Sequence, residues 1–207
     1  GWKLANLLDG ENPPDLDEFI RELTEAAVSI GFPIFLRTGQ GSGKHQWKDC
    51  CYVICKEDPM QHVYNLVEWS HCVDMMGLPH DVWAVREFLP TIPLGVCERY
   101  GGMPVCREFR FFVNGSHVLC SHGYWPLDSL NEGEFAADVP EGWYDEFCKL
   151  PTDCDLNALA SKAGAALVGS WSIDILETKR GWFITDAAMA AMSWHWPDCP
   201  NNPRKKE

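Results

Sequence analysis

The chain has 207 residues, of which 46% are hydrophobic, and its formal net charge is −13. This length allows one sizeable domain or two small lobes with a real hydrophobic core. The acidic balance argues against nucleic acid as the main partner, because that binding needs clustered Lys and Arg to neutralise phosphates. The one basic run, RKKE at residues 204–207, is typical of a solvated tail.

No stretch of the sequence resembles a membrane or secretion signal. The longest nearly uncharged stretches, such as AGAALVGSWSI, fall short of the ~20 apolar residues needed to cross a bilayer. The N-terminus lacks the basic-then-apolar plan of a signal peptide. We therefore expect a cytoplasmic protein that does not bind membranes.

The ten cysteines are scattered and include no C-x-x-C motif. This pattern favours free, mostly buried thiols over a disulfide framework. His195 and Cys199 have a spacing that zinc ligands can have, but no partner pair is visible elsewhere in the sequence, so zinc is not predicted.

The first third of the chain predicts a helix followed by two strands. Asp15, with Glu18 three positions later, caps a helix over 15–30, and Gly31 ends it. The segments PIFLR and DCCYVIC then have strand character. Helical spacing returns over 60–76, up to Gly77, and VWAVREFLP follows as a strand stopped by Pro90.

A hairpin is predicted over residues 106–122, with a two-residue turn at Asn114 and Gly115. Alternation along its first strand separates a charged face from an apolar one. The first face has Glu108, Arg110 and Phe112, and the second has Phe109, Phe111 and Val113.

The rest of the chain predicts an irregular excursion over 124–154, a short helix opened by Asp155, and a last hairpin around Gly181. The whole order of elements predicts an α+β fold with mostly antiparallel neighbours.

The glycine loop, which we define as residues 37–49 (RTGQGSGKHQWKD), suggests phosphate binding. It fails the P-loop pattern, because Thr38 stands in the place of a glycine and His45 in the place of the hydroxyl that holds Mg²⁺. A P-loop leads into a helix, whereas this loop joins two predicted strands. Backbone N–H groups of a mobile loop, with Arg37 and Lys44 as cations, can still bind phosphate, and Lys48 either adds to them or only solvates the strand start.

The last hairpin predicts a metal site. If Lys179 to Gly181 form a three-residue loop, Asp174 lies opposite Asp186 on one face. Facing carboxylates repel each other unless a cation lies between or beside them, and Mg²⁺ suits such oxygen ligands. The alternatives are a register shifted by one residue, or two acids that simply face water.

The order of these strands, loops and hairpins is similar to the ATP-grasp fold. VREFLPTIPLGVCERYGGMPVCREFRFFVNG resembles the eukaryotic cell-division-cycle ATP-grasp proteins that assist assembly of a translation initiation factor, and the chain looks closer still to small ATP-grasp proteins of phages and bacteria. The resemblance covers roughly residues 30 to 195. It implies a single ATP-grasp domain in which an N-terminal lobe (about 1–89) and a C-terminal lobe (about 90–207) grip ATP between them.

The resemblance also implies a role for each candidate residue. The cations of the first lobe would bind phosphate, and the segment after them would bind adenine: Arg37, Lys44 and Lys48, then Glu87, Phe88 and Leu89. The second lobe would present Glu108 and Arg110 to the nucleotide, and Asp174 and Asp186 would hold Mg²⁺.

Two departures from the family pattern stand out. Ala188 takes the place of the usual Asn metal ligand, which Ser193 or His195 would have to replace. The chain also begins only about thirty residues before the first strand, too few for the preceding domain of many relatives.

The first functional hypothesis is an ATP-dependent ligase, in which an acyl phosphate of a carboxylate-bearing acceptor, possibly a protein or peptide, is attacked by an amine or other nucleophile. The second is an ATP-binding assembly factor or chaperone without turnover. The third is a P-loop-like phosphotransferase, which a helix beginning near Lys44 would favour.

Overall fold

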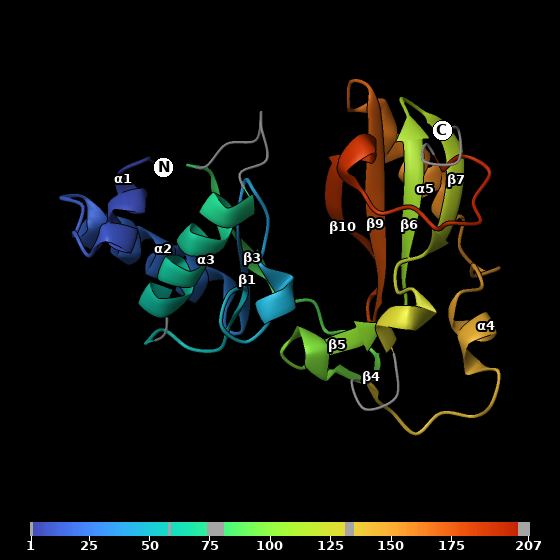
Figure 1. Cartoon of the computed structure of the whole chain (residues 1–207), viewed down its shortest axis with the longest axis horizontal. Coiled ribbons are helices and arrows are strands. Elements are labelled where there is room, and N and C mark those ends of the chain that lie inside the picture. Colours follow the sequence, from blue (N-terminus) through green and yellow to red (C-terminus); the bar gives the residue numbers. More distant parts are fainter. Residues whose placement is uncertain (1, 58, 74–80, 131–134, 203–207) are drawn as a thin grey trace. The chain divides into compact units, whose positions relative to one another are not determined.

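The chain forms two compact units (Figure 1). In the computed structural model, the described parts of the chain are residues 2–57, 59–73, 81–130 and 135–202. Unit 1 consists of residues 1–89 and 98–103. Unit 2 consists of residues 90–97 and 104–207. The predicted helix end at Gly77 and the basic run at 204–207 lie outside the described residues.

Unit 1 packs two long helices against a three-stranded antiparallel sheet of order β2-β1-β3 (Figure 1). Its elements are α1 (Trp2–Ala5), η1 (Asn6–Asp9), α2 (Leu16–Ile30), β1 (Ile34–Thr38), η2 (Lys44–Gln46), β2 (Tyr52–Val53), α3 (Pro59–Val73), β3 (Trp83–Glu87) and η3 (Glu98–Tyr100).

The predicted helix α2 is confirmed, but its cap is wrong. Leu23 and Ala27, from its apolar stripe, are buried against the sheet residues Ile34 and Leu36. Asp15 occupies the N-cap position, yet its side chain makes no capping hydrogen bond to the described first turn. The helix ends as predicted at a glycine of positive φ, whose N–H donates to Ala27 O.

The two strands around the glycine loop are confirmed, although the second is shorter than predicted. Only Tyr52 and Val53 of the predicted 49–55 strand pair with β1. The preceding residues form turns, because the chain must first come back from the single 3₁₀ turn η2 (Lys44–Gln46).

Unit 2 is built on a four-stranded antiparallel sheet of order β10-β9-β6-β7, with α5 packed on one face (Figure 1). A second, smaller sheet has the order β5-β4-β8. The elements are β4 (Pro93–Cys97), β5 (Met103–Cys106), β6 (Glu108–Asn114), β7 (His117–Gly123), η4 (Leu127–Leu130), β8 (Phe135–Ala136), α4 (Trp143–Phe147), α5 (Leu156–Ala165), β9 (Ser170–Thr178), β10 (Gly181–Met189) and η5 (Ala190–Met192).

The predicted two faces of β6 are confirmed. Phe109, Phe111 and Val113 are fully buried, and they pack with α5 and the inner residues of β9. The helix α5 is capped as expected, because Asp155 Oδ1 accepts the N–H of Ala158 at 3.0 Å. The charged face of β6 therefore points away from this core.

The predicted turn of the first hairpin is wrong by one residue. Asn114 pairs with His117, so the two turn residues are Gly115 and Ser116. An irregularity between Phe112 and Val113 then shifts the pairing along β7. A left-handed φ of 53° at Gly115 explains why glycine stands at the turn, although it takes the first turn position rather than the second that the Asn-Gly signal suggests.

The predicted irregular excursion over 124–154 contains more order than expected. Its described residues include η4, the two residues of β8, and the short helix α4. Short elements of this kind escape sequence patterns because they hold too few residues to show a period.

Candidate functional site

Four polar side chains lie in one row across the larger sheet of unit 2. In the strand register, Asp186 on β10 pairs with Asp174 on β9, Asp174 pairs with Arg110 on β6, and Arg110 pairs with His122 on β7. Paired residues share a face of the sheet, so these four form what we call the charge row. The row lies on the face opposite α5.

The centre of the charge row is a bidentate ion pair. Arg110 Nε donates to Asp174 Oδ1 at 2.7 Å, and Arg110 Nη2 donates to Oδ2 at 2.8 Å. The side chains are 14% and 3% exposed, respectively. Burial disfavours the charged guanidinium, but the hydrogen bonds and charge of Asp174 more than offset this and raise the pKa of Arg110.

The pairing of Asp174 with Asp186 agrees with the sequence count, although the loop does not. Gly181 pairs with Thr178, so the hairpin loop is Lys179 and Arg180 alone. A β-bulge between Ile184 and Asp186 adds one residue back to the strand. The two differences cancel, and the carboxylates face each other.

The cation that offsets the repulsion between these carboxylates is Arg110. Both oxygens of Asp174 accept from its guanidinium, whereas Asp186 is half-buried and accepts the N–H of Ala187 at 3.0 Å. The repulsion argument alone therefore does not require a metal ion. The facing oxygen ligands still have the chemistry that Mg²⁺ prefers.

Glu108 begins the same strand as Arg110 and points to the same face. Its Oε1 accepts from Thr185 Oγ1 at 3.1 Å, and this hydroxyl also lies 3.3 Å from Asp174 O. The hydroxyl of the bulge residue Thr185, on β10, thus links β9 to Glu108 on β6.

His122 closes the row in a neutral form. Its Nδ1–H donates to Gly123 O at 2.9 Å, and its Nε2 accepts the N–H of Trp196 at 3.4 Å. The pKa of His122 is lowered to about 4, chiefly by burial; the nearby His195 and Arg110 also lower it, and Gly123 O raises it. The positive charge of the row is therefore that of Arg110.

In unit 1, two of the three predicted phosphate-binding cations flank the turn of the glycine loop. Arg37 lies half-buried on β1, where it pairs with Ala84 of β3. Lys44, also half-buried, begins η2. Lys48 is exposed in the turn that follows. Because η2 is one 3₁₀ turn that leads to a strand, this loop lacks the helix of a P-loop.

The glycine loop is packed, which corrects the expectation of a mobile flap. Gln40 and Ser42 are 1% and 8% exposed. A Cβ at Gly41 would lie 2.5 Å from the Trp69 ring of α3. Thr38 N–H donates to Gly41 O at 2.8 Å, and Thr38 Oγ1 lies 2.8 Å from Ser70 Oγ. Glycine is needed here for close approach to α3.

The predicted adenine segment lies at the end of β3. Glu87 is exposed, while Phe88 and Leu89 are half-buried. The ring of Phe88 contacts Tyr52 and Trp47, with centroids 4.9 and 5.8 Å away. Trp47 is 8% exposed, so this ring is part of the core.

The sequence reasoning did not find the partner of His195 and Cys199. Cys120, on β7, lies within reach of both, and all three ligand atoms lie within 4.8 Å of one another. Cys120 precedes His195 by 75 residues, so no local spacing could reveal it.

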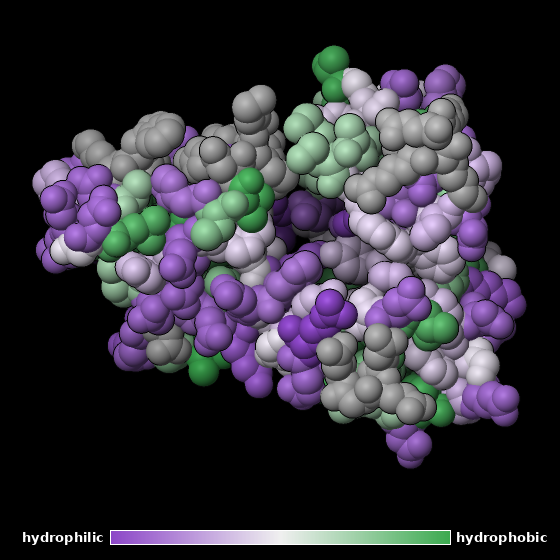
Figure 2. All heavy atoms as spheres, viewed as in Figure 1, coloured by the Kyte–Doolittle hydropathy of each residue, from purple (hydrophilic) through white to green (hydrophobic). Residues whose placement is uncertain are grey.

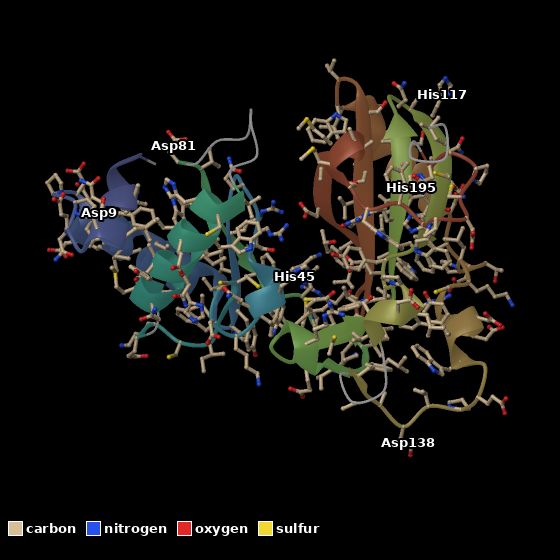
Figure 3. All side chains as sticks on the ribbon, in the orientation of Figure 1. Asp9, His45, Asp81, His117, Asp138 and His195 are labelled. Atoms are coloured by element: carbon tan, nitrogen blue, oxygen red, sulfur yellow. The ribbon has the colours of Figure 1, made fainter. Side chains whose placement is uncertain are left out.

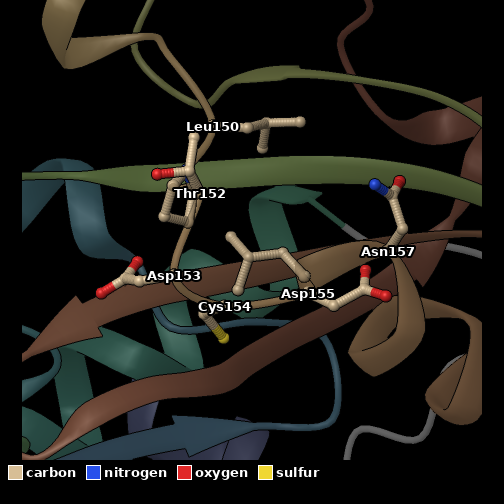
Figure 4. A pocket seen from close by; sticks show the side chains of 8 residues that line it. Leu150, Thr152, Asp153, Cys154, Asp155 and Asn157 are labelled. Atoms are coloured by element: carbon tan, nitrogen blue, oxygen red, sulfur yellow. The ribbon is translucent and has the colours of Figure 1, made fainter.

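A cavity of about 350 Å³ lies at the start of α5 (Figure 4). It is lined by residues 150–157, and its acidic side chains are Asp153 and Asp155. The Asp155 side chain is already used to cap α5. None of the predicted site residues lines this cavity, and it carries no part of the function proposed below.

Solved structures share this fold. Cdc123 from Schizosaccharomyces pombe matches with a TM-score of 0.57 and 13% identity, covering 91% of this chain and 74% of its own. A C-terminally truncated form of Cdc123 from the same organism matches with a TM-score of 0.54 and 13% identity, covering 86% of this chain and 68% of its own. A RimK domain ATP-grasp protein from Sphaerobacter thermophilus matches with a TM-score of 0.40 and 14% identity, over 82% of this chain and 49% of its own.

The likeness to Cdc123 confirms the predicted fold, including the predicted similarity to cell-division-cycle ATP-grasp proteins. At this identity it establishes the fold alone. No family model and no curated protein matches the sequence. Among the described helices, none has the length and apolar content that a bilayer crossing needs.

Proposed function

We propose that this chain binds Mg-ATP. The observation that carries the proposal is the charge row, in which two facing carboxylates and an arginine occupy neighbouring strands of a sheet with the fold of Cdc123. This fold resemblance implied a metal pair at Asp174 and Asp186 and a phosphate ligand at Arg110. Its carboxylate oxygens would suit a hard cation, and the arginine beside them would suit a phosphate.

Asp186 and Asp174 would hold Mg²⁺, which when bound neutralises phosphate charge. Arg110 orients Asp174 through two hydrogen bonds. When ATP is bound, Arg110 would also contact a phosphate oxygen. Glu108, held by Thr185, would contact the nucleotide from the same face. Ala188 offers no ligand in the family's Asn position.

Unit 1 would contribute the remaining contacts to ATP. Arg37, Lys44 and the exposed Lys48 supply positive charge near backbone N–H groups of the glycine loop, which suits β- and γ-phosphates. The segment from Glu87 to Leu89 would bind adenine through its backbone and the Glu87 carboxylate.

The first candidate use of ATP is ligation. A carboxylate attacks the γ-phosphorus, ADP leaves, and an amine or other nucleophile then displaces phosphate from the acyl phosphate. The groups of the chain would position these reactants and neutralise their charge rather than form covalent bonds.

Turnover tests this candidate directly. The full chain, incubated with Mg-ATP and a panel of carboxylic acids and peptides, should release ADP and phosphate with one of them. Asp186→Ala and Arg37→Ala should abolish release, whereas Asp145→Ala and Arg21→Ala, at exposed positions, should retain it. Turnover that survives both site changes would refute the assignment.

The second candidate use is binding without turnover, as in an assembly factor. Two observations favour it: Ala188 offers no metal ligand, and the chain shares the fold of Cdc123 with TM-scores of 0.57 and 0.54. Calorimetry should then show Mg²⁺-dependent ATP binding, prolonged incubation should yield no ADP, and an affinity purification should recover a protein partner.

Ala188→Asn distinguishes the two uses. Ala188 is half-buried on β10 and pairs with Ser172. An added amide ligand should tighten Mg²⁺-dependent ATP binding in either case. The appearance of ADP only in this variant would mean that the missing ligand is what prevents turnover.

A further inference from the structure

Three side chains with zinc-ligand chemistry converge beside the outer strand of the larger sheet. Cys120 belongs to β7, and His195 and Cys199 belong to the segment after η5. Figure 3 shows His195 in this segment, in front of the sheet. The Sγ atoms of both cysteines and a ring nitrogen of His195 all lie within 4.8 Å of one another.

The spacing of these atoms suits a single tetrahedral ion. Cys120 Sγ lies 3.2 Å from His195 Nε2, and the thiol of Cys120 is also hydrogen-bonded to that of Cys199. Zinc bonds of about 2.3 Å to sulfur and 2.0 Å to nitrogen place tetrahedral ligand atoms roughly 3.5–3.8 Å apart. Small movements of the side chains are therefore enough to bind the ion.

The segment that supplies two of these ligands is held in place by other contacts. The His195 ring stacks on Phe112 of β6, with centroids 4.0 Å apart. Asn201 Nδ2 donates to Leu119 O at 2.8 Å, which joins the segment to β7 next to Cys120. Cys199 N–H donates to Trp196 O at 3.1 Å and forms a turn. The ligands are thus oriented without the ion.

We propose that Cys120, His195 and Cys199 form a zinc site with three protein ligands and one position open to water or another ligand. Two thiolates and an imidazole favour Zn²⁺, whereas the carboxylates of the charge row favour Mg²⁺. Binding replaces the two thiol protons, which pass to solvent, and involves no change of oxidation state. All three residues are half-buried, so one side of the ion remains accessible.

The site would fasten the segment after β10 to β7, the opposite outer strand of the sheet. The same segment contacts the charge row, because Trp196 N–H donates to His122 Nε2 and Trp194 O lies 3.5 Å from Arg110 Nη1. Zinc should therefore stabilise unit 2 as a whole.

Metal content tests the proposal. The full chain, purified under reducing conditions, loaded with Zn²⁺ and dialysed, should retain about one zinc per chain. Cys120→Ser and Cys199→Ser should each lower the retained zinc by tenfold or more, and Cys72→Ser, at an exposed cysteine, should not. Asp186→Ala should retain zinc, which separates this site from the Mg-ATP proposal.

Two measurements on the unaltered chain guard against variants that do not fold. Zn²⁺ should protect Cys120 and Cys199 from alkylation, as read by peptide mass, and should raise the melting temperature until a chelator is added. Co²⁺ should give the thiolate charge-transfer band of a tetrahedral site. Equal zinc in the site variants and Cys72→Ser, alkylation unchanged by Zn²⁺, or a Cys120–Cys199 disulfide in the reduced, metal-loaded chain would overturn the proposal.

Discussion

The two units hold their candidate nucleotide-binding groups in different ways. Unit 2 places its charges on adjacent strands of a regular sheet, where strand pairing sets which side chains meet. Unit 1 places its cations around a loop whose shape depends on contact between glycine backbone and Trp69. The residues that meet on paired strands can be predicted by counting along the sequence. The shape of a packed loop cannot, because it depends on tertiary contacts that the sequence does not display.

The largest expected effect tests the buried ion pair of unit 2. Arg110→Ala leaves Asp174, which is 2% exposed, without its guanidinium, and should lower the free energy of unfolding by about 3–5 kcal/mol. Urea unfolding followed by fluorescence measures this. Arg21→Ala removes an exposed pair with Glu25 in unit 1 and should cost less than about 1 kcal/mol. Equal losses would mean that Asp174 is not buried as described.

The next effect tests the packing of the glycine loop in unit 1. Gly41→Ala forces a methyl group against the Trp69 ring and should cost about 2–3 kcal/mol in urea unfolding. Gly10→Ala has a positive φ of 77° but open space around its Cβ, and should cost only about 1 kcal/mol. If Gly41→Ala lowered the free energy of unfolding no more than Gly10→Ala does, the glycine loop would be mobile, as the sequence predicted.

The third test asks whether water is excluded from the thiol of Cys51, in the core of unit 1. The pKa of Cys51 is raised to about 12, chiefly by burial and also by neighbouring Cys50. The unfolded thiol, with a pKa of about 8.5, ionises first, so the stability present below pH 8.5 is lost as the pH rises toward 12.

The expected slope is about 1.4 kcal/mol per pH unit from this thiol. Cys51→Ala should have a shallower loss of stability between pH 8.5 and 10 than the unaltered chain, measured by urea unfolding at each pH. Cys72→Ala controls for the removal of one exposed thiol. Identical slopes in all three proteins would mean that water reaches Cys51.

The smallest effect compares helix starts in the two units. Asp155→Ala removes the capping hydrogen bond to Ala158 N and should cost about 1 kcal/mol. Asp15→Ala, at an N-cap position without that bond to the described first turn, should cost clearly less. Thermal unfolding of the two variants gives the order, and the reverse order would contradict the assigned caps.

Regular periods made most of the fold predictable. The alternation of β6 assigned Phe109 and Phe111 to the core and Arg110 to the opposite face, since neighbours on a strand must point to opposite sides. The apolar stripe of α2 was found in the same way. Local loop lengths were less accurate, because one residue more or less in a turn leaves the composition unchanged.

The parts of the candidate sites that could not be predicted depend on long-range contact. Trp69 lies on a helix that follows the glycine loop, and only the packed structure shows that it excludes a side chain at Gly41. Cys120 likewise meets His195 because β7 lies beside the segment after β10 in space. Arg110 was expected near phosphate, but its capture of both Asp174 oxygens required the register of two distant hairpins.

The bulge at Thr185 offsets the two-residue loop before it, so that Asp186 still pairs with Asp174. A related chain with a three-residue loop and no bulge would bring the same carboxylates together, since one residue has only moved from strand to turn. Insertions and deletions at these two places can therefore compensate for each other. Alignments of distant relatives that treat the loop and the strand separately would misplace Asp186 by one residue.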